Sequence, residues 1–454
     1  MKEIIIDAKL PLLTKLSYAL PAFSLAVIGI PVYVYMPKFY TDVIGLNIAY
    51  VGGVLLAARI FDAVTDPAIG LLSDRTVSRF GRRRPWIAIG SFFTAAAVIL
   101  LFNPSVTGNI NLNYHFAVSV FMLFLFWTIV VVPYESLGPE LTFNYNDRNS
   151  LFSFRDGFLI AGTLAAAASP AIVKGITGAA SSPEDERYVF FILSVIYAPL
   201  IIISCLWCIT VLKEKNISEK REHLSIIKGL SYTFKNRPFL ILLAAYTISA
   251  IGNNLPATLI LFYVQYVLHS PLADLFLLLY FITGILFLPL WIKAAERFGK
   301  KNAWLSAMAI NTGAFTGVFL LGAGDTVMYG ILVFLSGTGF GATLALPSSM
   351  QADIIDYDEL MTGERREGQY VGIWSFAKKA AAAFGVGIGL TILGLSGYEP
   401  NIQQSESVTF TLRVLYALVP CLCNAAGFMI ALYYPITGAE FEKIRKSIQE
   451  KKGV

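Results

Sequence analysis

Apolar residues dominate this chain in twelve long segments, which short polar loops separate. Each segment is near 20 residues or longer, enough to cross a hydrocarbon core about 30 Å thick. The pattern therefore predicts an all-α membrane protein with twelve transmembrane helices. The segments cover residues 16–41, 47–73, 84–103, 113–137, 151–173, 188–212, 238–268, 271–294, 302–322, 327–350, 370–395 and 410–434.

Basic residues gather in every second loop, and the alternate loops carry few of them. Arg82, Arg83 and Arg84 lie in the loop after the second segment, whereas Lys174 and Arg187 are the exceptions in a sparse loop. Cytoplasmic loops of membrane proteins carry an excess of Lys and Arg. The bias predicts a multi-pass protein of the cytoplasmic (inner) membrane with both termini in the cytoplasm.

A repeated loop divides the chain into two similar halves. The loops after the second and eighth segments both contain an Arg-Phe-Gly sequence followed by basic residues and a tryptophan. Their glycines, Gly81 and Gly299, are 218 positions apart (299 − 81), about half the chain. Parallel repeats of six helices are typical of major facilitator transporters. We expect six-helix bundles at 1–212 and 238–434, a cytoplasmic linker at 213–237, either solvated or on the membrane surface, and a cytoplasmic tail at 435–454.

Composition agrees with a membrane protein and excludes other classes. Of the 454 residues, 56% are hydrophobic and 14% are charged, against about 25% charged in soluble domains. The net charge of +5 follows from the basic loops, so it does not indicate nucleic-acid binding. The sequence contains no nucleophile elbow, phosphate-binding loop or metal-ligand cluster. We expect neither an enzyme nor a bound cofactor or metal.

Three ionisable residues form a stripe within the second apolar segment. Arg59, Asp62 and Asp66 are three and four residues apart, which places them on one face of a helix. A charge at membrane depth costs at least about 2.5–3.5 kcal/mol. The stripe therefore predicts an ion-coupling face of a transporter. Alternatively, Arg59 is the charge partner of one carboxylate in a purely structural ion pair.

Other polar residues near membrane depth also require an explanation. Glu135 either binds substrate or a proton, or lies at the membrane interface. Arg155 either faces a cavity or extends to the cytoplasm. Of the adjacent Lys378 and Lys379, about 100° apart on a helix, at most one faces the cavity. Asn253 indicates either a discontinuous helix at the binding cavity or hydrogen bonds between helices.

Aromatic and basic residues suggest two further features. Tyr33, Trp127 and Trp374 lie on the same helices as the charged residues and offer an apolar surface with a polar handle. They fit a sugar ring, or the aromatic belt that membrane proteins place at the interface. The cytoplasmic group that contains Asp74, Arg75 and Arg84 predicts a gate, because Asp74 can pair with basic residues across the pore mouth when the cytoplasmic side is shut. The alternative is that these charges only set the topology.

Several stretches across nearly the whole chain resemble the glycoside–pentoside–hexuronide:cation symporter family of the major facilitator superfamily, which includes the melibiose permeases. The most specific is the stretch in the second segment that contains Asp62 and Asp66. The stretches are residues 15–18, 39–45, 58–67, 133–139 and 352–359 and the region around Lys379.

The resemblance implies roles for particular residues. Asp62, Asp66 and Thr128 match the family's cation site, and Thr65 replaces an asparagine there, which leaves Na⁺ and H⁺ both open. The resemblance also matches residues to the sugar pocket; these are Arg155, Lys379 and, in place of a tyrosine, Trp127.

Departures from the family pattern bear on the substrate. Where the family has two sugar-binding carboxylates, this sequence has Ala26 and Val131. Where the family has a tryptophan of the sugar pocket, this sequence has Glu135. Arg155 and Lys379 thereby lose their expected acidic neighbours, and two uncompensated cations would suit an anionic sugar. Alternatively, Glu135 restores the balance.

These observations predict cation-coupled (Na⁺ or H⁺) symport of a sugar or glycoside by alternating access. The alternative is a lipid, lysolipid or other organic-anion transporter of the same fold. The expected partners are a small-molecule substrate and the lipid bilayer, with no nucleic acid, and we expect a monomer.

Overall fold

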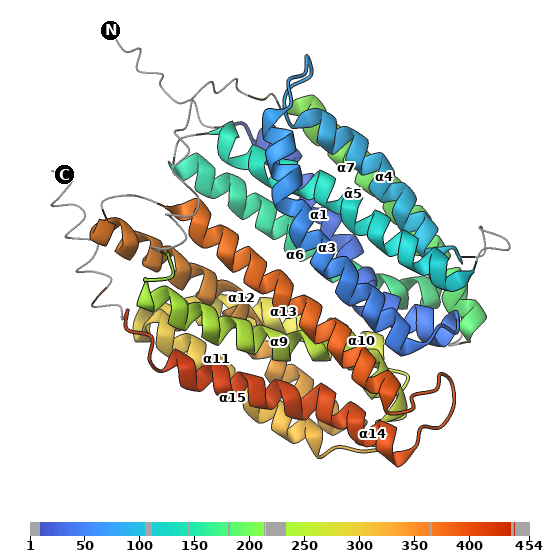
Figure 1. Cartoon of the computed structure of the whole chain (residues 1–454). Coiled ribbons are helices and arrows are strands. Elements are labelled where there is room, and N and C mark those ends of the chain that lie inside the picture. Colours follow the sequence, from blue (N-terminus) through green and yellow to red (C-terminus); the bar gives the residue numbers. More distant parts are fainter. Residues whose placement is uncertain are drawn as a thin grey trace, which may run out of the picture. The chain divides into compact units, whose positions relative to one another are not determined.

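A computed structural model describes residues 10–104, 111–142, 145–179, 182–212, 214, 233–362, 366–436 and 440. All regular elements in this part of the chain are helices (Figure 1). The chain divides into two compact units, Met1–Ser218 and Glu219–Val454. Most of the predicted linker and tail, at 213, 215–232, 437–439 and 441–454, lies outside the described residues.

In its described residues, the first unit contains six long helical segments. The first of them is not uniform, because two π-helical turns, η1 and η2, interrupt it; π-turns are rare and occur mostly within α-helices at functional sites. The bounds are α1 Leu12–Ile30, η1 Pro31–Tyr35, α2 Met36–Lys38, η2 Phe39–Val43, α3 Ile48–Arg75, α4 Arg84–Phe102, α5 Leu112–Leu141, α6 Tyr145–Thr177 and α7 Pro183–Val211.

The second unit also contains six long segments, the last of which includes a π-helical turn. The bounds are α9 Arg237–Tyr266, α10 Ala273–Phe298, α11 Lys300–Phe319, α12 Thr326–Thr362, α13 Glu367–Leu395, α14 Glu406–Arg413, η4 Val414–Leu418 and α15 Val419–Ala431.

The predicted all-helical membrane fold is confirmed. Within the described residues, eleven helical segments are long and apolar enough to cross a membrane. The segment predicted at 302–322 forms α11, which begins with two lysines and is not among those eleven. Pro133 lies inside α5 and Pro256 lies inside α9, and both helices are continuous through these prolines.

Helix packing repeats between the units. In the first unit α1 packs against α6 and α7, α3 against α5, and α4 against α5 and α7. In the second unit the equivalent helices make the same pairs: α9 with α13 and α15, α10 with α12, and α11 with α12 and α15. The two halves therefore share one arrangement of six helices, as parallel-repeat transporters do.

Local features fix the helices that carry the polar residues. Asn47 Oδ1 accepts hydrogen bonds from the backbone N–H groups of Ala49 and Tyr50 and so caps α3. The cap fixes where the helix begins and therefore which way its polar stripe faces. Gly162 brings α6 tightly against α1, because any larger residue would overlap the Phe23 carbonyl. The start of α6 lies beside the start of α1, where Lys15 Nζ donates to Ser150 Oγ at 3.0 Å.

Candidate functional site

The two carboxylates of the α3 stripe meet a single hydroxyl group on α5. Thr128 Oγ1 lies 2.8 Å from Asp62 Oδ1 and 3.1 Å from Asp66 Oδ1. Asp62 and Thr128 are buried, with 4% and 1% of their surface exposed. A hydroxyl donates one proton, so Thr128 bridges the carboxylates without neutralising either charge. The three side chains present oxygen atoms, which hard cations prefer as ligands.

Helix geometry brings this group together. Asp62 and Asp66 are one turn apart on α3, and α3 packs along α5. Thr65 lies on the same helix, and its hydroxyl donates to the Asp62 carbonyl at 3.1 Å. That bond directs the Thr65 proton to the backbone and leaves the hydroxyl oxygen as an acceptor.

Arg59 lies against aromatic side chains. Its guanidinium carbon is 4.1 Å from the ring centroid of Tyr33 and 4.5 Å from that of Phe124, and Nη1 donates to the Tyr33 hydroxyl at 3.1 Å. Cation–π contacts of this kind are stronger in a desolvated site, and Arg59 is 8% exposed. Tyr33 belongs to the π-helical turn η1, so the stripe on α3 contacts the irregular part of the first helix.

A second polar group surrounds Arg155 on α6. Its Nε and Nη2 both donate to Asp156 Oδ1, at 2.9 and 2.7 Å. Tyr18 of α1 and Glu135 of α5 lie within electrostatic reach of the same guanidinium. The prediction that Arg155 is an uncompensated cation is therefore wrong. Adjacent residues diverge on a helix, but an arginine is long enough to turn back to its neighbour.

The remaining predicted substrate residues are spread over both units. Trp127 is half-buried on α5, next to Thr128, and Glu135 is exposed on the same helix. Lys379 and Trp374 lie on α13 of the second unit, where Lys379 is half-buried. Trp374 is 7% exposed and stacks on Tyr246 of α9 with ring centroids 4.3 Å apart. That stack covers one face of the indole ring.

A closed polar triad joins α9 to α15 in the second unit. Ser249 donates to Asn424 Oδ1 at 2.5 Å, Asn424 donates to Asn253 Oδ1 at 3.0 Å, and Asn253 donates back to Ser249 at 3.3 Å. Each member therefore bonds to the other two. With α9 continuous, the hydrogen-bonding interpretation of Asn253 describes this region, and the discontinuous-helix interpretation does not.

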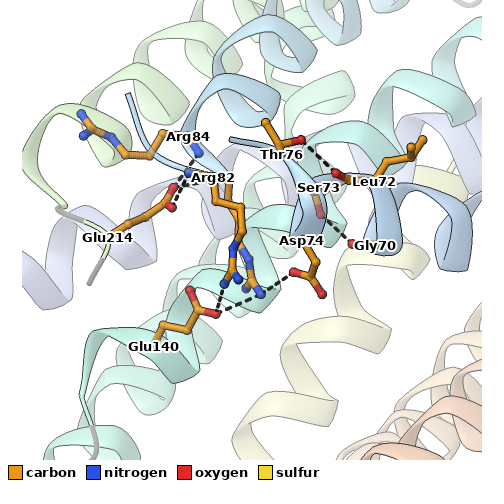
Figure 2. A network of polar contacts seen from close by, with 10 residues as sticks. Gly70, Leu72, Ser73, Asp74, Thr76, Arg82, Arg84, Glu140 and Glu214 are labelled. Atoms are coloured by element: carbon orange, nitrogen blue, oxygen red, sulfur yellow. Dashed lines mark hydrogen bonds and ion pairs between the residues drawn. The ribbon is translucent and has the colours of Figure 1, made fainter. Parts of the chain in front are cut away.

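A carboxylate from another segment binds the backbone N–H groups between α3 and α4 (Figure 2). Glu214, just after α7, accepts the N–H groups of Arg82 at 2.6 Å and of Arg83 and Arg84 at 2.8 Å each. Gly81 makes room for this contact: its φ is +108°, and a Cβ there would lie 2.9 Å from the Glu214 carboxylate. An acid at the start of α4 also complements the positive end of the helix dipole.

Side chains of the same loop connect α3, α4 and α5. Arg83 Nη2 lies 2.8 Å from Asp74 Oδ1 and 3.0 Å from Glu140 Oε1, and Arg82 Nη2 lies 2.6 Å from Glu140 Oε1. Asp74 thus pairs with a basic residue of its own unit, Arg83, whereas the gate prediction concerns pairing across the pore mouth. Arg75 is exposed on the last turn of α3, and Arg84 contributes its backbone N–H.

The equivalent loop of the second unit, between α10 and α11, uses lysines. Lys300 Nζ lies 2.7 Å from both carboxylate oxygens of Asp353 on α12. Lys301 Nζ donates to the carbonyls of Leu432 and Tyr434, at 2.7 and 2.9 Å, just after α15. This loop therefore also joins its unit's fourth and sixth helices.

Sequence reasoning missed three residues with clear structural roles: Phe124, Glu140 and Glu214. It noted Asp156 beside Arg155 at the start of an apolar segment but assigned it no role. Glu214 had no signal in the sequence, because it is more than a hundred residues from its backbone partners and lies in a loop of mixed charge.

Comparisons with known proteins agree with this fold. The sequence profile described as MFS/sugar transport protein matches residues 17–438. A glucuronide carrier protein homolog of Escherichia coli (strain K12) is 28% identical, over 92% of both chains. The isoprimeverose transporter of Lactiplantibacillus pentosus is 27% identical, over 96% of this chain and 91% of its own. A crystal structure of the nucleoside transporter NupG superimposes with a TM-score of 0.65 at 14% identity, over 94% of this chain and 100% of NupG.

In the described residues, twelve helical segments form two repeated bundles, and one helix face carries a buried and a half-buried carboxylate. Together with the profile match, these features define a multi-pass membrane transporter of the major facilitator type and not an enzyme. The profile match extends over most of the chain, and the relatives cover almost all of it. The chain belongs to the MFS/sugar transport protein family, within the glycoside–pentoside–hexuronide:cation symporters.

Proposed function

We propose that this transporter couples the movement of Na⁺ or H⁺ to that of a sugar or glycoside by alternating access. Its sugar-transport relatives, which include an isoprimeverose transporter and a glucuronide carrier homolog, support a carbohydrate substrate. The basic loops support an orientation with both termini in the cytoplasm, in the cytoplasmic (inner) membrane. We propose that the protein acts as a monomer.

The observation that carries the coupling proposal is the shared contact of Asp62 and Asp66 with Thr128. The two carboxylate oxygens can be no farther apart than these two bonds placed end to end. Two like charges about 5.5 Å apart repel by about 3 kcal/mol at an effective dielectric constant of about 20. A cation or proton between them removes that repulsion, so the pair is suited to take up one positive charge and to release it.

Substrate coupling follows from thermodynamic linkage. If cation binding between Asp62 and Asp66 tightens sugar binding, the sugar tightens cation binding by the same factor. We propose that Thr65 and Thr128 complete the cation site with their hydroxyl oxygens. Substrate binding is assigned by resemblance and residue chemistry; the proposed residues are Tyr33, Trp127, Glu135, Arg155, Trp374 and Lys379.

Replacement of Asp66 with cysteine tests the coupling. The variant keeps a small side chain but removes one carboxylate, so gradient-driven accumulation should fall to background while exchange of labelled sugar across the membrane persists. Proteoliposomes loaded with a panel of neutral glycosides and glucuronides measure both, with a Na⁺ gradient and a pH gradient imposed separately. Unimpaired accumulation in this variant would remove Asp66 from the coupling role.

A matched substitution controls for general damage. Asp185 lies at the exposed start of α7, where its backbone N–H donates to Ser182, and Asp185→Cys should accumulate sugar normally. Thr128→Val keeps the shape and removes one oxygen ligand, so it should weaken the driving cation's apparent affinity about tenfold, equivalent to about 1.4 kcal/mol. The gradient that drives uptake in the unmodified protein identifies the coupling ion.

A further inference from the structure

The Arg155–Asp156 ion pair on α6 is partly exposed and uses one carboxylate oxygen. Both guanidinium bonds go to Asp156 Oδ1, and the Asp156 side chain is 56% exposed, against 26% for Arg155. The guanidinium carbon also lies 4.7 Å from the centroid of the Phe152 ring. The pair therefore presents a carboxylate oxygen, guanidinium N–H groups and an aromatic ring close together.

The position of this pair within an apolar helix indicates what its exposed side meets. The stretch Ser150–Thr177 has the length and hydropathy of a membrane span, and its charged residues are Arg155, Asp156 and Lys174. Arginine and lysine reach the interface on long stems, but the aspartate side chain is too short to do so. A carboxylate that faced lipid would cost several kcal/mol. The exposed side of Asp156 thus faces water.

Neutral hydroxylated molecules match the chemistry of this pair. Each sugar hydroxyl both donates and accepts hydrogen bonds, so neighbouring hydroxyls can accept from the Arg155 guanidinium and donate to Asp156. Hydrogen bonds to charged groups contribute about 1.5–3 kcal/mol each. The Phe152 ring adds an apolar surface for the C–H face of a sugar.

Anionic substrates meet an obstacle at the same place. A carboxylate binds arginine best through two parallel N–H···O bonds, and Asp156 already holds the Nε and Nη2 groups of Arg155. An anionic sugar would have to displace Asp156 from that edge, or bind on the Nη1 side of the guanidinium and approach the negative charge of Asp156. With Asp156 in place, the pair carries no net charge.

We infer that Asp156 is a specificity-determining residue that selects neutral glycosides over anionic ones, because it occupies the Nε/Nη2 edge of Arg155 and cancels the charge of the guanidinium. This inference rests on the proposed sugar transport and adds the charge class of its substrate. It predicts that loss of the Asp156 charge converts the Arg155 site into one that accepts a uronide.

A ligand pair that differs at one position tests the inference. Proteoliposomes containing the unmodified protein should take up a neutral glycoside, such as a methyl β-glucoside or β-xyloside, in preference to methyl β-glucuronide. In Asp156→Asn the ratio of neutral to anionic uptake should fall at least tenfold. Asp156→Glu, which keeps the charge, should retain the neutral preference, and Asp185→Asn should leave the ratio unchanged.

The outcomes separate this inference from the proposed function. Accumulation with an unchanged ratio in Asp156→Asn, or a preference of the unmodified protein for the glucuronide, overturns the role of Asp156 while sugar transport stands. No gradient-driven uptake of any glycoside by the unmodified protein overturns both. If Asp156→Asn is not monodisperse after purification, Asp156→Ser replaces it with the same expected fall in the ratio.

Discussion

The two equivalent loops at Gly81 and Gly299 make the same connection within their units, but with the roles of side chain and backbone exchanged. In the first unit the carboxylate of Glu214, after the sixth helix, accepts backbone N–H groups of the loop. In the second unit the ammonium group of Lys301, in the first turn of α11 just after the loop, donates to the carbonyl of Leu432, after the sixth helix. Glu214 and Leu432 are 218 positions apart (432 − 214), the same shift that relates the glycines.

The two units therefore share the position of this contact but not its chemistry. In the first unit the chain after the sixth helix supplies an acceptor side chain, and in the second unit it supplies the backbone carbonyl that accepts from a lysine side chain. Both solutions agree with helix electrostatics: Glu214 lies at the positive start of α4, and Lys301 lies at the negative end of α15. The requirement common to both units is a link from the loop after the second helix to the chain after the sixth. Which side chain supplies it is free to differ.

The largest expected effect comes from Gly81→Ala, compared with Gly299→Ala. Both glycines have positive φ, of +108° and +87°, so each alanine adds backbone strain of about 1–2 kcal/mol. At Gly81 the new Cβ also meets the Glu214 carboxylate, whereas Gly299 has nothing within 4 Å. Gly81→Ala should therefore lower the free energy of unfolding by about 2–4 kcal/mol. A lower melting temperature of the detergent-solubilised protein would report this loss.

A double-mutant cycle isolates the part of this effect that depends on Glu214. In a Glu214→Ala background, the extra cost of Gly81→Ala over Gly299→Ala should vanish, because the clashing group is gone. Equal costs for the two alanine variants in the unmodified protein would mean that the Glu214 contact does not constrain Gly81.

The second effect compares the two links directly. Glu214→Ala removes the acceptor of three backbone N–H groups and should cost about 2 kcal/mol. Lys301→Met removes two bonds to carbonyls near the surface, which water can replace, and should cost about 1 kcal/mol or less. Thermal unfolding of both variants in one detergent gives the order; a larger loss for Lys301→Met would reverse our comparison.

The smallest effect tests redundancy in the Arg-rich loop. Glu140 contacts both Arg82 and Arg83, so Arg82→Gln leaves it one guanidinium and should cost about 0.5 kcal/mol. Lys300→Met should cost more, about 1 kcal/mol, because it removes the ammonium group that contacts both oxygens of the buried Asp353. If the two variants unfold at the same temperature, the second arginine gives no redundancy.

Hydropathy and spacing were enough to predict the fold, because membrane helices are set by length and local composition. The 3.6-residue period also placed Asp62 and Asp66 on one face, and the structure brings that face to Thr128. The resemblance, rather than spacing, pointed to Thr128, since no local pattern relates α3 to α5.

Contacts that depend on side-chain direction were not predictable in the same way. Arg155 turns back to Asp156, although a helix separates adjacent residues by about 100°. Arg59 lies between the rings of Tyr33 and Phe124, which come from two other helical segments. Glu214 contacts the backbone N–H of Arg83, which lies 131 positions earlier in the sequence. Each depends on helix packing, which a single sequence specifies only through the whole fold.

The two π-helical turns of the first helical segment, Pro31–Tyr35 and Phe39–Val43, have a consequence for its motion. Each wide turn holds roughly one residue more than a regular turn, closed by bonds from residue i to i+5. If such a turn moves along the helix by one position, the side chain of the residue that it passes rotates by about 100° about the helix axis, while the helix keeps its length. Tyr33 can thus be carried away from Arg59 by a rearrangement of backbone hydrogen bonds alone, without sliding one helix past another.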